Sequence, residues 1–483
     1  MEIRNKRLSE EEFFQQRKEV LAMWPTGKEV DLDEAVEYHK SIPVDKNGAL
    51  KTMEAKKNRV TELFCSSGTD TIAAHTELLQ YCREVGRVDH ASSYIDSFTR
   101  TGRFDMAEKG LKEAQKSGKQ VLNGFPFVCH GVGGTRAVME AVDMPVYVWG
   151  PAVDLRLVME IGLAGGHSGY SGGPLISFWN YAKNVPLEQV IRFYQYVNRL
   201  MGYYEEKGIP ILYGVSGAMP TITPPSMMTA TKIIETLIAA EQGCKHILLN
   251  NWAQGNMGQD IGSIITHSKL AHEYLHKFGY DDVETVAFSV DPTGRYPAEE
   301  PRVYSLISYF AMIGALAGVQ MIGVRTVDEA KHVPTKESIS ASHQCARMMI
   351  NMLKDQQNEF VKSDAVKVEA RMEELETRAI LDKVLEMGDG DVVVGAIRAV
   401  EAGVLDQSYA TSQFVKCAVM GVKDAYGAAR YLDHGNLPFD REIIGFHKEK
   451  IAERQEKIGR KVDYDVLVKD ITAISAGSLL PEQ

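Results

Sequence analysis

Two short motifs are the first places where residue types and spacing could do chemistry. His272-Glu-Tyr-Leu-His276 fits the H-E-x-x-H pattern, which on a helix places two imidazoles on one face for zinc. The motif lies at the end of a predicted helix, before Lys277-Phe-Gly279, and no third ligand is evident in the sequence. We therefore interpret these histidines as exposed helix-end residues, and we expect no metal site.

The second motif is Gly169-Tyr-Ser-Gly-Gly173, which fits the G-x-S-x-G pattern of a nucleophile elbow. An elbow needs a strand before the serine and a helix after it. Here a helical pattern precedes the motif and Pro174 follows it. We therefore do not expect a serine hydrolase. No dinucleotide fingerprint or Walker loop occurs either, because His130-Gly-Val-Gly-Gly134 lacks the third glycine.

Composition and charge exclude several further classes. The chain has 483 residues with a net charge of −11 and no basic run, which argues against nucleic acid or an anionic membrane as partner. The six cysteines are scattered without metal-ligand spacing, and no export signal is recognisable. We expect a cytoplasmic protein with reduced thiols. The uncharged segment 307–324 contains glycines that divide it into a buried helix and a strand, so we expect no membrane span.

The segment 210–260 shows which elements must position any functional residues. It reads as a buried strand, a loop rich in glycine and proline, a helix capped by Ser226, and a second buried strand at His246–Asn250. Another glycine-rich loop, 251–258, follows that strand. A βαβ unit of this kind has parallel strands, which place functional residues in the loops after their carboxyl ends.

The same alternation of strands and helices continues along the chain and predicts an α/β fold. Nine strand candidates occur where a closed barrel needs eight, so one of them is not a barrel strand. A (β/α)8 TIM barrel is the preferred fold, and an open doubly wound sheet is the alternative. The candidates are 59–65, 92–96, a short segment at Val121, 145–149, 174–177, 209–213, 246–250, 284–290 and 320–324.

Two segments without this alternation of strands and helices flank the predicted barrel. Residues 1–57 are polar with a helical pattern and form an N-terminal extension. The barrel occupies residues 58–355. Residues 356–483 form a separate C-terminal helical and mixed region, with helices predicted at 369–387 and 392–402 before a polar tail.

Several motifs spread over the whole chain resemble one family, the large (epsilon) subunit of glutamate mutase, also called methylaspartate mutase. They occur in the family's order, from the first residues to the last thirty. The motifs are 12–33 (EFFQQRKEVLAMWPTGKEVDLD), Leu122-Asn-Gly-Phe-Pro126, Tyr181-Ala-Lys-Asn184, Pro224-Pro-Ser-Met227, Ala239-Ala-Glu-Gln-Gly243, Gly255-Asn-Met257, Pro334-Thr-Lys-Glu337 and Gly435-Asn-Leu-Pro438.

The resemblance implies an adenosylcobalamin-dependent carbon-skeleton isomerase. In that family a TIM barrel holds the substrate, and a separate small subunit carries the signature D-x-H-x-x-G and most of the cobalamin. That signature is absent from this chain, as expected for a large subunit whose cobalamin is carried by a separate small subunit. The expected assembly is two large and two small subunits.

Most of the family's adenosyl-binding positions are kept or conservatively changed. By resemblance, Gly68, Asn123 and Glu329 match cofactor contacts, while Arg325, Tyr296 and Val333 replace a lysine, a phenylalanine and an isoleucine; Asn180 stands at a proline position. Arg325 and Glu329 directly follow a predicted strand, where a carboxylate can accept hydrogen bonds from ribose hydroxyls. Without the resemblance, a surface ion pair would be the simpler interpretation of this pair.

The family's substrate-binding positions differ much more. Glutamate mutases hold two carboxylates with three arginines, of which Arg100 alone is present here. Ser66 and Trp149 occupy the other two positions, Ser171 matches the glutamate that receives the substrate ammonium, and Ser177 matches a tyrosine; Tyr181 is retained. Each charge-assisted contact contributes about 1.5–3 kcal/mol, so these changes should cost several powers of ten in affinity for glutamate.

We therefore predict a mutase whose substrate keeps one carboxylate for Arg100 but is less anionic than glutamate, and bulkier or more apolar. Trp149 would supply apolar surface, and the serines would leave room. Arg100 could instead be a structural residue on a barrel loop. Two other classes stay open: a non-catalytic scaffold or regulatory relative of the large subunit, and a barrel enzyme that no longer uses cobalamin.

Overall fold

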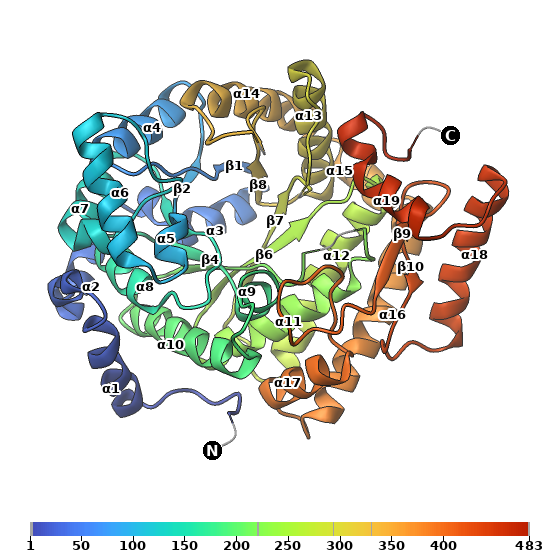
Figure 1. Ribbon diagram of the computed structural model, residues 1–483, viewed down its shortest axis with the longest axis horizontal. Helices are drawn as coiled ribbons and strands as arrows, with labels where there is room; N and C mark the ends of the chain where they lie inside the picture. The colour runs from blue at the N-terminus through green and yellow to red at the C-terminus, as the bar shows by residue number, and fades with distance from the viewer. Residues whose placement is uncertain (1–2, 220–221, 293, 330, 482–483) are drawn as a thin grey trace.

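A closed ring of eight parallel strands lies at the centre of the molecule (Figure 1). The computed structural model describes residues 3–219, 222–292, 294–329 and 331–481. The strands pair in chain order, and β1 closes the ring against β8. They are β1 (Glu62–Cys65), β2 (His90–Tyr94), β3 (Val146–Trp149), β4 (Gly169–Gly172), β5 (Leu212–Val215), β6 (His246–Trp252), β7 (Glu284–Val290) and β8 (Met321–Val324). The prediction of a (β/α)8 barrel is confirmed.

The fourth strand was predicted in the wrong place. The segment 174–177 belongs to a helix, and β4 is the glycine-rich segment just before it. Pro174 favours a helix start because its fixed φ suits the first helical turn. Gly169 must be small, since a Cβ there would lie 2.4 Å from the carbonyl oxygen of Leu212. Val121, the other surplus candidate, lies in a loop and its N–H donates to Asp70.

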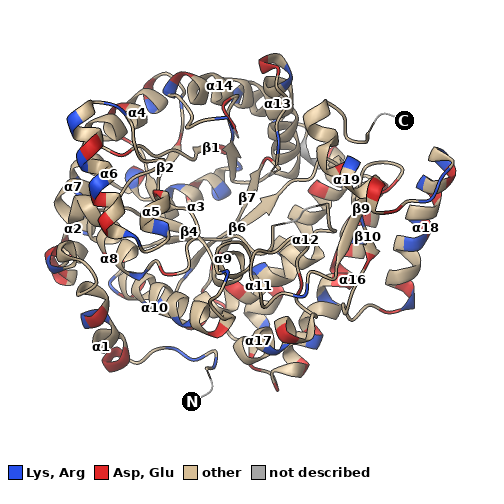
Figure 2. Ribbon diagram, in the orientation of Figure 1, with Lys and Arg blue, Asp and Glu red and all other residues tan. Residues whose placement is uncertain are grey.

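Helices surround the barrel in the order that the alternating pattern predicts. Each strand is followed by one or more of them: α4 (Ile72–Glu84), α5 (Ser97–Arg100), α6 (Phe104–Ser117), α7 (Phe127–Ala141), α8 (Arg156–Ala164), α9 (Pro174–Tyr181), α10 (Leu187–Glu206), α11 (Ser226–Glu241), α12 (Met257–Lys277), α13 (Glu300–Ala317) and α14 (Lys336–Leu353). Lys, Arg, Asp and Glu are concentrated on these outer helices, and the central strands are largely free of colour in Figure 2. Ser226 begins α11 but does not cap it; its hydroxyl pairs with the Tyr431 hydroxyl at 3.1 Å.

The N-terminal extension closes the barrel at the amino-terminal ends of its strands. Its elements are α1 (Glu10–Leu21), η1 (Pro25–Glu29), α2 (Leu32–Ser41), η2 (Val44–Lys46) and α3 (Gly48–Asn58). Ala49 of α3 packs against Phe64, Tyr147 and Leu212 inside the barrel. Beside them, the buried His90 bonds to the Tyr147 hydroxyl at 2.7 Å. This end is therefore a filled core, and an open site can form only at the opposite, carboxyl end of the strands.

The C-terminal region lies against the α11 and α12 side of the barrel (Figure 1). It contains α15 (Gln357–Val361), α16 (Asp364–Met387), α17 (Val392–Ala402), β9 (Met420–Lys423), β10 (Ala429–Asp433), α18 (Arg441–Ile458), α19 (Tyr464–Ala473) and η3 (Ile474–Ala476). The expected polar tail is thus a β-hairpin followed by helices. Contacts such as Thr229 Oγ1 donating to Glu373 at 2.6 Å join the region to the barrel.

The uncharged segment 307–324 forms the end of α13 and all of β8, as predicted. Within the described ranges, no helix combines the length and apolar character that crossing a membrane requires.

Candidate functional site

A cavity of about 550 Å³ opens at the carboxyl ends of the barrel strands. Interior side chains alternate along each strand, so Trp149 and Asn250 form a layer directly above Tyr147 and Leu248. Of the thirteen residues predicted for the site, the following nine line this cavity: Ser66, Gly68, Asn123, Trp149, Ser171, Tyr181, Arg325, Glu329 and Val333. The structure therefore gathers residues from the two predicted walls around one shared space.

Arg100 lies at the rim of this cavity, on the short helix α5 that follows β2. Its guanidinium carbon sits 4.6 Å from the ring centre of Tyr181 and 5.4 Å from that of Tyr94. Nε donates to the carbonyl of Pro151 at 3.0 Å and Nη1 to the Tyr94 hydroxyl at 3.3 Å. Nη2 is buried and has no protein partner among the described residues. Such a donor can receive a carboxylate oxygen from a ligand.

Three aromatic rings form an apolar floor beneath the cavity. Phe64 of β1 and Trp149 of β3 lie 4.2 Å apart between ring centres, and Phe288 of β7 lies 5.9 Å from Trp149. All three line the cavity. Because these rings fill the barrel from three different strands, the floor is rigid and offers stacking surface to an apolar ligand.

A small polar cluster stands beside the floor, on β4, on β6 and directly after β5. The Asn250 amide nitrogen donates to the hydroxyl oxygens of Ser171 and Ser216, each at 2.9 Å. Ser171 and Asn250 are almost completely buried, and so is Ser216. The Asn250 carbonyl oxygen has no partner within the described part of the chain. This wall can therefore form hydrogen bonds, but it carries no charge.

The opposite wall carries the charges. Arg325 directly follows β8 and pairs with Glu329, which is one quarter exposed at the cavity. Asp291 lies behind them and accepts a hydrogen bond from the Tyr296 hydroxyl at 3.3 Å. Burial raises the pKa of Asp291 to about 7, although the nearby Arg325 guanidinium opposes the shift. Arg325 Nε is buried without a protein partner in the described residues, so this wall also has a free donor.

The other three predicted residues stand outside the cavity lining. Ser177 is fully buried in α9 and its hydroxyl pairs with Tyr194 at 2.7 Å. Asn180 accepts a hydrogen bond from Gln407 of the C-terminal region at 3.0 Å. Tyr296 lies one layer behind Arg325, on Asp291. Any effect that these three residues have on a ligand must pass through their neighbours.

Sequence reasoning missed several lining residues, notably Asn250, Ser216, Tyr94 and Trp252. A usable signal was present, because Asn250 ends a predicted strand and Ser216 follows another one within three residues. The carboxyl-end rule for parallel barrels would have selected both. Tyr94 and Trp252 are harder to find, because aromatic residues at strand ends usually belong to a core.

Both short motifs can be judged from their surroundings. His272 and His276 are exposed at the end of α12, and His276 pairs with Asp281 at 2.6 Å. The described residues contain no group of three or more His, Cys, Asp or Glu that could hold a metal ion.

The G-x-S-x-G motif does lie on a strand followed by a helix, so the reason given above for dismissing it was wrong. Ser171 nevertheless sits within β4 and not at the turn, and its hydroxyl is bonded to Asn250 rather than to a histidine. This environment does not activate a serine nucleophile.

Comparison with known proteins gives one consistent result. Residues 42–483 match the family described as Methylaspartate mutase E chain (MutE). The glutamate mutase epsilon subunit of Desulfitobacterium hafniense (strain Y51) is 40% identical over 481 residues, covering 99% of both chains. That of Treponema denticola is 39% identical over 481 residues and that of Yersinia enterocolitica is 36% identical over 482 residues, again with 99% of both chains covered.

Proposed function

Because the chain belongs to the methylaspartate mutase E chain family, we propose that its barrel mouth is the substrate and adenosyl site of an adenosylcobalamin-dependent mutase. The chain is the large subunit of a carbon-skeleton mutase of this type. Its partner in the proposal is a small subunit with the D-x-H-x-x-G signature, in an assembly of two large and two small subunits. The substrate carries one carboxylate and is less anionic and more apolar than glutamate.

The charged wall of the cavity fits the adenosyl part of such a cofactor. Glu329 presents a partly exposed carboxylate that can accept hydrogen bonds from two ribose hydroxyls, and Arg325 fixes its orientation. The unpartnered Arg325 Nε offers a further donor on the same wall. Gly68, Asn123 and Val333 complete the side of the cavity where the cofactor would lie. When bound, adenosylcobalamin supplies the radical that takes a hydrogen atom from the substrate.

The position of Arg100 carries the proposal for the substrate. Its guanidinium is held from two sides by Pro151 and Tyr94, and its remaining nitrogen is left for a ligand carboxylate. Tyr181 stacks on the guanidinium and covers it from solvent. The aromatic floor then contacts the rest of the substrate and excludes water, which protects a radical reaction from side reactions.

The test combines the full chain with such a small subunit and adenosylcobalamin under anoxic conditions. Candidate amino and hydroxy acids are added, and the paramagnetic signal is followed by electron spin resonance. We expect a signal with the true substrate, and we expect Arg100→Met to lower the substrate affinity by about 10- to 100-fold through loss of a charge-assisted contact. A tight complex that gives no signal with any ligand contradicts catalysis and supports a scaffold role.

A further inference from the structure

One side of the cavity is uncharged throughout its described lining. Every lining residue between positions 149 and 252 is neutral, in contrast to the wall with Arg325 and Glu329. The polar groups on that side include the amide of Asn250 and the hydroxyls of Ser171 and Ser216, together with the unpartnered indole N–H of Trp252. A substrate held at Arg100 by its carboxylate must place another part of its structure against this side.

The hydrogen bonds in this cluster determine what it can recognise. Both hydrogens of the Asn250 amide are used, one on each serine oxygen. Each serine hydroxyl therefore keeps its own hydrogen, which has no acceptor within the described part of the protein. The Asn250 carbonyl oxygen is buried and also lacks a protein partner there. In this amide orientation the cluster thus carries two O–H donors and one C=O acceptor that the described protein leaves unpaired.

Three ligand groups can be compared against this arrangement. A carboxylate would accept from the serines but would face the Asn250 carbonyl with a negative charge. An ammonium would donate to that carbonyl, yet none of the described residues that line this side of the cavity is a carboxylate that could pair with its charge. A carboxamide satisfies both requirements, because its oxygen accepts from serine and its nitrogen donates to Asn250. This selection holds for the amide orientation of the structure, in which the nitrogen faces both serines. An amide turned by half a turn would present its nitrogen to the ligand and would accept a diacid, an outcome that the affinity comparison below detects.

We propose that Ser171, Ser216 and Asn250 form a neutral subsite that binds an uncharged carboxamide end of the substrate, opposite the carboxylate held by Arg100. This inference rests on the proposed function, since it concerns the other end of the same substrate. It assigns Asn250 and Ser216 as residues that determine specificity. The substrate class is then a carboxylic acid that also carries an amide.

Matched ligand pairs can test the subsite without the reaction. Succinate and succinamate, glutarate and glutaramate, and adipate and adipamate differ within each pair only in one terminal group. Their affinities for the full chain, in complex with the cobalamin-binding subunit, are measured by isothermal titration calorimetry. For the chain length that binds best, we expect the amide to bind at least about tenfold more tightly than the diacid, because the diacid leaves a buried acceptor unpaired.

Two variants separate this inference from the proposed function. Asn250→Asp puts a carboxylate in the cluster, and it should abolish the amide preference and favour an ω-amino acid of equal length. Arg100→Met should weaken both members of each pair without changing their ratio. Ser216→Ala removes one of the two hydroxyl donors and should lower the preference for the amide. Its matched control is Ser289→Ala, since Ser289 is a buried strand serine on β7 that faces Gly314 of α13 outside the cavity.

The outcomes are distinguishable. Equal affinities for amide and diacid in the wild-type chain, or a ratio that Asn250→Asp leaves unchanged, overturn the neutral subsite while Arg100 dependence keeps the proposed function. Binding that does not depend on Arg100, or no binding of any pair, overturns the carboxylate site and the inference with it.

Discussion

At the scale of single residues, the site consists of strong polar groups that the protein leaves incompletely paired. Arg100 Nη2, Arg325 Nε and the Asn250 carbonyl oxygen are all buried without a protein partner among the described residues. A buried unpaired group costs about 1–3 kcal/mol, and a cavity is where such a cost is recovered by a ligand. All three groups occur around one cavity, where a ligand could complete their hydrogen bonding.

Glu329 provides a residue-scale prediction for cofactor binding. Replacing it by Gln keeps the size of the side chain but removes the charge that strengthens hydrogen bonds from ribose hydroxyls. We expect adenosylcobalamin to bind the complex about tenfold more weakly, because a charge-assisted bond becomes a neutral one. Spectrophotometric titration of the complex with the cofactor measures this.

The matched control is Glu337→Gln, in the first turn of α14 and outside the cavity lining. The Glu329 assignment is wrong if both variants bind the cofactor equally well.

At the scale of elements, one buried carboxylate links the two segments that carry the neutral wall. Glu235 of α11 accepts hydrogen bonds from the N–H groups of Leu175 and Gly217, at 2.8 and 3.0 Å. The first lies at the start of α9 and the second directly follows Ser216. A Cβ at Gly173 would lie 2.3 Å from the Glu235 carboxyl carbon, so the chain needs glycine there. Glu235 is thus a positioning residue for β4, β5 and α9.

Glu235→Gln tests this role through both binding and pH. A glutamine has one acceptor oxygen in place of two, so we expect the β4 and β5 ends to shift and ligand affinity at the cavity to fall several-fold. Burial raises the pKa of Glu235 to about 7, above the unfolded value of 4.5. Its contribution to stability is therefore present below pH 4.5 and is lost as pH rises through 7, a change of about 3 kcal/mol.

Urea denaturation between pH 5 and pH 9 measures the consequence. The variant lacks this titration, so its stability relative to the wild-type chain should rise with pH. Glu188→Gln, which alters an exposed carboxylate on α10, is the control and should follow the wild-type curve. A Glu235→Gln curve that runs parallel to the wild-type curve would show that the carboxyl group is not buried as described.

The region around β4 also shows why the sequence predicted the barrel but not every strand. The apolar runs at β6 and β7 are strong strand signals, and their predicted starts at His246 and Glu284 match the structure. β4 consists of Gly-Tyr-Ser-Gly, which has low strand propensity and forms only because its neighbours leave room for a backbone without bulky side chains. Cavity residues such as Tyr94 and Trp252 were missed because their role depends on strand register around the ring.

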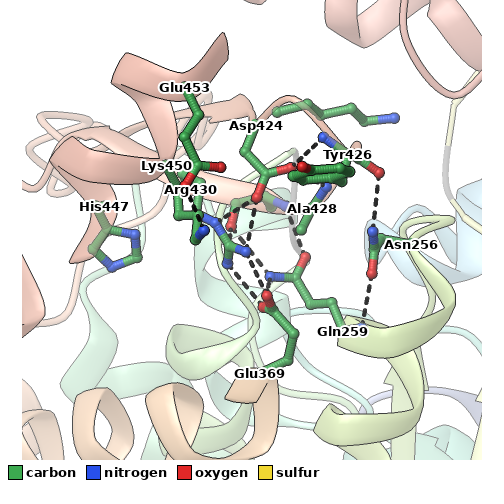
Figure 3. Close-up of polar contacts among 12 residues, drawn as sticks. Asn256, Gln259, Glu369, Asp424, Tyr426, Ala428, Arg430, His447, Lys450 and Glu453 are labelled. Atoms are coloured by element: carbon green, nitrogen blue, oxygen red, sulfur yellow. Dashed lines mark hydrogen bonds and ion pairs between the residues drawn. The ribbon is translucent and has the colours of Figure 1, made fainter. Parts of the chain in front are cut away.

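At the scale of the whole molecule, the N-terminal segment and the C-terminal region both form hydrogen bonds to the outside of the barrel. The backbone N–H of Asn5 donates to Asp391, the N-cap of α17, while Leu8 N–H donates to Gln242 after α11. The N-terminal segment 5–8 thus connects the barrel to the C-terminal region. On the other side, the β9–β10 hairpin bonds to Gln259 and Asn256 at the start of α12 (Figure 3). α12 begins five residues after Trp252, so the hairpin supports the β6 end of the cavity.

Arg430, which lies on β10 next to the turn of this hairpin, gives the prediction at this scale. Its guanidinium forms two bonds with Glu369 of α16, and Nε donates to Asp424 at 2.9 Å (Figure 3). The arginine side chain is only 3% exposed. Arg430→Met leaves two carboxylates without their cation in a buried position, which typically costs about 3–5 kcal/mol. We expect a loss of that size in the free energy of unfolding, measured by urea denaturation.

The control for Arg430 is Arg371→Met on α16, where an exposed arginine pairs with Glu442 at 3.3 Å. An exposed pair contributes at most about 1 kcal/mol, so this variant should unfold close to the wild-type chain. The double variant Arg430→Met with Glu369→Met should recover part of the loss, because one of the two uncompensated charges is removed. If Arg430→Met is no more destabilising than Arg371→Met, the hairpin does not depend on this ion cluster. The backbone bonds to Gln259 and Asn256 would then hold it against α12 by themselves.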